Sequence, residues 1–112
     1  MKAIILSLLI FPMILMAQVD KQTLSRYESQ LSEVKQGILL LMDERAETLE
    51  GTLRYQDLEK NIGELDAKSI QTQDNLTLLQ SGLNDAEQTR LVRVIENDLQ
   101  NMKSTVQDVT GR

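Results

Sequence analysis

Apolar residues follow a helical repeat in DKQTLSRYESQLSEVKQGILLLM, which is residues 20–42. They are separated alternately by three and four positions, so they fall on one side of a helix. These residues, the first seam, are Leu24, Tyr27, Leu31, Val34, Ile38 and Leu41. The spacing is the heptad repeat of helices that pack against other helices. It predicts a helix that begins after Asp20, a residue suited to the N-cap position.

A second apolar seam with the same spacing runs through the end of the chain. This last seam consists of Val92, Ile95, Leu99, Met102, Val106 and Val109. Before it, Gly82 suits the end of a helix, and Asn84 followed by Glu87 resembles a capping box. The seam is also offset by two residues from the heptads that precede it. We therefore expect a break near residues 82–85 and a final helix that ends at Gly111.

Between the two seams the apolar spacing is less regular. It is lost around residues 45–51 and later passes through two polar residues, Ser69 and Thr72. The apolar positions of this part are Leu58, Ile62, Leu65, Leu76, Leu79 and Leu83. Residues 18–112 contain no proline, so nothing forces a helix to stop before residue 81.

The sequence thus predicts an all-α fold. We expect one long helix over residues 20–81 and a shorter C-terminal helix that folds back on it as an antiparallel helical hairpin or coiled coil. The alternative is a compact three-helix bundle with an extra turn near Gly51. In the hairpin, part of the long helix would leave its seam uncovered, which favours a homo-oligomer or a partner helix. Five consecutive apolar residues at 38–42 are expected to be buried on more than one side.

Residues 1–17 carry the pattern of a secretory signal peptide. A basic start at Lys2 is followed by an apolar run that extends to Ala17. The run is shorter than the roughly 20 residues of a membrane-spanning helix. We expect cleavage after Ala17, which leaves residues 18–112 as a single helical coiled-coil domain in the periplasm or outside the cell. The alternative is an uncleaved N-terminal membrane anchor formed by residues 3–19, and only then would the protein contact a membrane.

The composition argues against several classes of function. The chain has no histidine and no cysteine, so the usual zinc and transition-metal ligand sets are missing. No nucleophile with an activating neighbour and no phosphate-binding glycine loop can be identified. The net charge of −5 disfavours nucleic acid, which binds basic surfaces. We therefore expect no catalytic residue, no metal, no cofactor and no enzymatic activity.

These observations together predict a non-catalytic, exported coiled-coil protein of a bacterial cell envelope. It would act as a structural or adaptor protein through its two seams, by self-association or by binding a partner helix. The arrangement of a signal peptide followed by heptad seams resembles the oligomerising coiled-coil modules of bacterial envelope proteins and the helical minor subunits of bacterial secretion machinery. The alternatives are an amphipathic lipid-binding protein of the apolipoprotein type and a periplasmic holdase chaperone.

Overall fold

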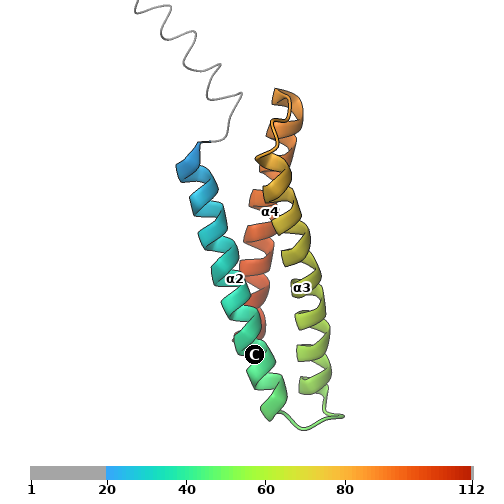
Figure 1. Cartoon of the computed structure of the whole chain (residues 1–112). Helices are drawn as coiled ribbons and strands as arrows, with labels where there is room; N and C mark the ends of the chain where they lie inside the picture. The colour runs from blue at the N-terminus through green and yellow to red at the C-terminus, as the bar shows by residue number, and fades with distance from the viewer. Residues whose placement is uncertain (1–19, 112) are drawn as a thin grey trace, which may run out of the picture.

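The computed structural model describes residues 20–111, which form three helices. They are α2 (Lys21–Glu47), α3 (Leu53–Leu79) and α4 (Asp85–Thr110). Helices α2 and α3 run antiparallel, and α4 turns back alongside both, so each helix contacts the other two (Figure 1). No strand occurs between residues 20 and 111. The all-α prediction is confirmed, in the form of the three-helix bundle. The predicted signal peptide lies outside the described residues.

A turn at residues 48–52 interrupts the helix that we expected to continue to residue 81. Gly51 adopts a φ of 84°, a left-handed conformation that glycine enters without the steric penalty of a Cβ atom. The Thr48 hydroxyl donates a hydrogen bond of 2.7 Å to the Glu44 carbonyl at the end of α2. The Thr52 hydroxyl accepts one of 3.2 Å from the Tyr55 amide as the N-cap of α3. Two threonine caps and one glycine thus end the first helix without a proline.

The other helix ends follow the local signals in the sequence. Asp20 accepts a hydrogen bond of 2.9 Å from the Thr23 amide and begins α2. The chain turns between α3 and α4 at Gly82, whose φ is 82°. Asn84 then caps α4 by accepting a bond of 2.9 Å from the Glu87 amide. The side chains of Asp20 and Asn84 each bond to one of the amides that a helix leaves unpaired at its first turn.

The core lies along the common axis of the three helices. Its buried apolar residues are Tyr27, Leu31, Val34, Ile38, Leu41, Leu58, Ile62, Leu65, Leu76, Leu79, Leu91, Ile95, Leu99, Met102 and Val109. Ser69 and Thr72 are also buried. Their hydroxyls donate to carbonyls of their own helix, at 2.8 Å to Asp66 and 2.9 Å to Lys68. This polar layer therefore leaves no hydroxyl unsatisfied, which avoids the main cost of burying it.

Helices α2 and α4 approach each other closely at Gly37. A Cβ atom added to Gly37 would lie only 2.7 Å from Cγ1 of Val106. Glycine is buried here because no side chain fits between the two helices. By contrast, Gly63 lies on the outside of α3, where an added Cβ atom would meet nothing within 4 Å.

Candidate docking surface

The structure brings the two predicted seams together inside one chain. Nine of their twelve residues are buried: Tyr27, Leu31, Val34, Ile38, Leu41, Ile95, Leu99, Met102 and Val109. The other three, Leu24, Val92 and Val106, are partly buried and pack against the core. A partner helix would have to open the bundle to reach these side chains. Most seam side chains are thus already covered by the chain's own helices, so large exposed apolar side chains elsewhere are more accessible to a partner.

Sequence analysis missed three buried residues of α4. Leu91, Gln88 and Asp98 all lie inside, whereas the predicted Val92 is only half-buried. The positions of Gln88, Leu91 and Ile95 also follow a spacing of three and four, which was the available signal. Asp98 is buried beside a basic partner, because its Oδ1 atom lies 3.7 Å from the ammonium nitrogen of Lys68 on α3. This pair links α3 to α4.

Large apolar side chains are exposed at the end of the bundle where α2 turns into α3. We define the turn-end surface as Leu39, Leu40, Asp43, Glu47, Leu49, Glu50 and Leu53, all of which are exposed. The four leucines are exposed by 59% (Leu39), 67% (Leu40), 77% (Leu49) and 84% (Leu53). Leu39 and Leu40 are neighbours on the outer face of α2, and Leu49 and Leu53 follow in the turn and at the start of α3, so this end of the bundle exposes more than a single isolated leucine.

The expectation that residues 38–42 are buried on more than one side is wrong. Only Ile38 and Leu41 are buried, and Met42 lies at the border of exposure. Each residue advances by about 100° around a helix, so Leu39 and Leu40 point away from the side that Ile38 presents to the core. In the part of the chain that the structure describes, residues 20–111, no further helix covers that outer face.

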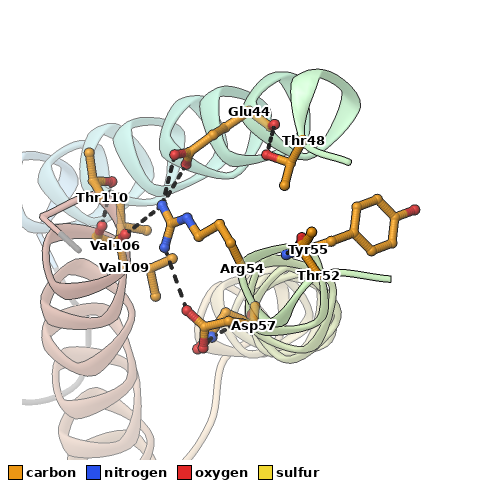
Figure 2. A network of polar contacts seen from close by, with 10 residues as sticks. Glu44, Thr48, Thr52, Arg54, Tyr55, Asp57, Val106, Val109 and Thr110 are labelled. Atoms are coloured by element: carbon orange, nitrogen blue, oxygen red, sulfur yellow. Dashed lines mark hydrogen bonds and ion pairs between the residues drawn. The ribbon is translucent and has the colours of Figure 1, made fainter. Parts of the chain in front are cut away.

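Arg54 fixes the geometry of this end of the bundle (Figure 2). Its Nη2 atom donates to both carboxylate oxygens of Glu44 at 2.8 Å and to the carbonyl oxygen of Val109 at 3.1 Å. Its Nη1 atom lies 3.5 Å from the carboxylate of Asp57. The guanidinium thus joins α2, α3 and the C-terminal end of α4, where a positive charge also favours the helix dipole. Figure 2 shows the ring of Tyr55 pointing away from this network.

The opposite half of the bundle contains a groove between α2 and α4. It has a volume of 460 Å³, and Tyr27, Gln30, Glu96 and Lys103 are among the residues that line it. Burial raises the pKa of the Tyr27 phenol above its ordinary value of 10.0, and the carboxylate of Glu96 raises it further. The guanidinium of Arg26, 5.4 Å from the ring centre, acts in the opposite direction. The groove is lined by basic and acidic side chains and by three glutamines. Its charge therefore does not favour either anionic or cationic ligands.

The raised pKa of Tyr27 gives the bundle a measurable alkaline sensitivity. In the unfolded chain the phenol ionises near pH 10.0, whereas the folded protein keeps it neutral to a higher pH. The corresponding stability is complete below pH 10.0 and is lost as the pH rises through the pKa of the folded state. We expect Tyr27→Phe to lose less stability than the unmodified protein between pH 9 and pH 11 in urea unfolding. If both proteins lost the same free energy of unfolding over this pH range, the pKa of Tyr27 would not be raised in the folded state.

Between residues 20 and 111, no three histidine, cysteine, aspartate or glutamate side chains lie close enough to hold a metal ion together. None of the three helices has a stretch sufficiently long and apolar to span a lipid bilayer. The candidate site is the turn-end surface, because its four leucines are among the most exposed large apolar residues. Comparison of the chain with protein-family models, with curated proteins and with solved structures finds no match in any of the three.

Proposed function

We propose that this protein is an exported, non-catalytic adaptor of a bacterial cell envelope, which binds other protein helices at its turn-end surface. The observation that carries the proposal is the exposure of four leucines at one end of a bundle whose other seams are already filled. Exposed apolar patches on small soluble domains commonly mark interaction sites. The signal-peptide pattern of residues 1–17 supports export. Such a protein would serve as a small component of an envelope or secretion assembly.

The fixed geometry of the turn end supports a binding role. The hydrogen bonds of Arg54 connect the last turn of α2, the start of α3 and the end of α4. They therefore fix the positions of the helix ends near the exposed leucines. A partner that binds an already ordered surface loses less conformational entropy than one that must order it. The backbone that carries Leu40 on α2 and Leu53 on α3 is thus ordered before a partner binds.

Photo-crosslinking in the cells that produce the protein tests this function. A photoreactive amino acid in place of Leu40 should give a protein adduct of higher mass, whereas the same probe in place of Ile70 should not. Ile70 is a matched control because it is also exposed, on the outer face of α3. Cell fractionation on the same samples should find the chain outside the cytoplasm with Gln18 at its N-terminus. Equal adducts from both positions, or none from Leu40, would contradict the proposal.

A lipid surface is the second candidate for the turn-end leucines, because exposed leucines can also insert into a bilayer. Asp43, Glu47 and Glu50 lie among these leucines and would be repelled by anionic headgroups. Flotation with anionic vesicles separates the two candidates. We expect the protein to stay with the soluble fraction.

A further inference from the structure

We propose that the turn-end surface binds a short amphipathic helix of another protein, one whose apolar residues are flanked by lysine or arginine. This inference rests on the proposed function and specifies the chemistry of the partner. It is drawn from the arrangement of charge among the exposed leucines.

Apolar and acidic side chains occupy the same outer face of α2. Asp43 lies one helical turn after Leu39 and three residues after Leu40, and Glu47 lies one further turn along. Side chains three or four residues apart are neighbours on a helix surface. All four residues are exposed. A helix lying on this face would therefore contact leucines and carboxylates together.

The carboxylates of this surface have no basic partner in the described part of the chain. The ion pairs there involve Glu44, Asp57 and Asp98, whereas Asp43, Glu47 and Glu50 form none. Arg45 is the nearest arginine in sequence, but it lies seven residues after Ile38 and so falls on the core side of α2. The outer face consequently presents uncompensated negative charge beside exposed apolar area.

Charge complementarity selects among the possible occupants. A second copy in a two-fold symmetric contact would bring the same acidic surface against itself, and like charges across an interface are unfavourable. Anionic lipid is disfavoured for the same reason. Lysine or arginine residues beside an apolar seam would instead pair with Asp43 and Glu47, in the way that flanking charges select partners in coiled coils. A helix is the matching shape, since residues 20–111 offer no strand edge.

Two matched synthetic peptides test the proposal. Both carry the same leucine seam on a helix, but one has lysine and the other glutamate at the flanking positions. Fluorescence anisotropy with the purified protein should show binding of the lysine peptide, weakening as salt is added, and markedly weaker binding of the glutamate peptide. Equal affinity for both peptides, or no binding of the lysine peptide, would overturn the proposed chemistry.

Paired variants locate the binding site. Asp43→Lys with Glu47→Lys should weaken binding of the lysine peptide by about tenfold. The control, Asp66→Lys with Asp74→Lys, changes the net charge equally at exposed positions of α3 and should have little effect. Leu39→Ser with Leu40→Ser should also abolish most of the binding, while Ile70→Ser with Leu78→Ser should not. Equal effects of a test pair and its control would exclude the turn-end surface.

The outcomes separate this inference from the proposed function. If both peptides bind equally and both need Leu39 and Leu40, the adaptor function stands and the basic partner is excluded. If light scattering shows a dimer that Leu39→Ser with Leu40→Ser dissociates, the occupant is a second copy. If anionic vesicles compete with the lysine peptide at the leucines, the surface binds lipid. Each of these results overturns the basic partner helix.

Discussion

Ile95→Asp should unfold the bundle. Ile95 is 0% exposed and lies in the core of α4. Removing a buried isoleucine side chain costs about 2–5 kcal/mol, and burying an unpaired carboxylate adds to that cost. A domain of this size is stabilised by roughly 5–10 kcal/mol in total, so most of its stability would be lost. We expect circular dichroism to show a large loss of helix at neutral pH and a urea midpoint close to zero.

Ile70→Asp is the matched control for this substitution. It makes the same chemical change on a helix, but Ile70 is 56% exposed on the outer side of α3. Exposed substitutions of this kind usually change stability by less than about 0.5 kcal/mol. The helical signal and urea midpoint should therefore remain near those of the unmodified protein. If Ile95→Asp were as stable as Ile70→Asp, the packing of α4 against α2 and α3 would be wrong.

Alanine substitutions at two helix glycines should have opposite effects. Alanine favours a helix interior by about 1 kcal/mol over glycine, so Gly63→Ala should stabilise the protein by that amount. Gly37→Ala gains the same helix propensity, but its new Cβ atom would lie 2.7 Å from Val106 Cγ1. Overpacking of this kind costs about 1–3 kcal/mol, and the stiff valine side chain adapts poorly. We expect a net destabilisation of about 1 kcal/mol for Gly37→Ala in urea unfolding.

The double variant Gly37→Ala with Val106→Ala identifies the cause. Removing the two Cγ atoms of Val106 takes away the contacts at 2.7 and 3.3 Å, so the new methyl group then has space. The two substitutions should therefore be less destabilising together than the sum of their separate effects. Strict additivity, or stabilisation by Gly37→Ala alone, would show that α2 and α4 are not in close contact at this point.

Heptad spacing was sufficient to predict most of the core. Residues such as Leu31 and Leu99 repeat at three and four positions because the same side of each helix faces the bundle axis. The spacing also placed Ser69 and Thr72 inside, and their short hydroxyls are satisfied within α3. The capping residues also predicted the break before Asn84. They could do so because a cap bonds to amides that are close to it in sequence.

Features that depend on distant parts of the chain could not be predicted in this way. Arg54 and Val109 are 55 positions apart, so their hydrogen bond depends on the completed bundle. The exposure of Leu39 and Leu40 depends on how the helices pack, because no other helix within residues 20–111 covers the outer face of α2. At Gly51 the sequence contained the signal, a glycine between two capping threonines, but the absence of proline favoured a continuous helix. The seams correctly indicated helix packing, yet spacing alone cannot distinguish packing within a chain from packing between chains.

The position of α4 against both other helices also determines what happens to a chain that lacks it. Without residues 85–110, α2 and α3 can form only a hairpin, which leaves core residues such as Leu31 and Leu65 without the cover that α4 provides. Transiently open apolar faces of this kind attract chaperones and promote aggregation. A chain released early by a nonsense mutation in this helix would therefore be degraded or aggregate rather than persist as a shorter bundle.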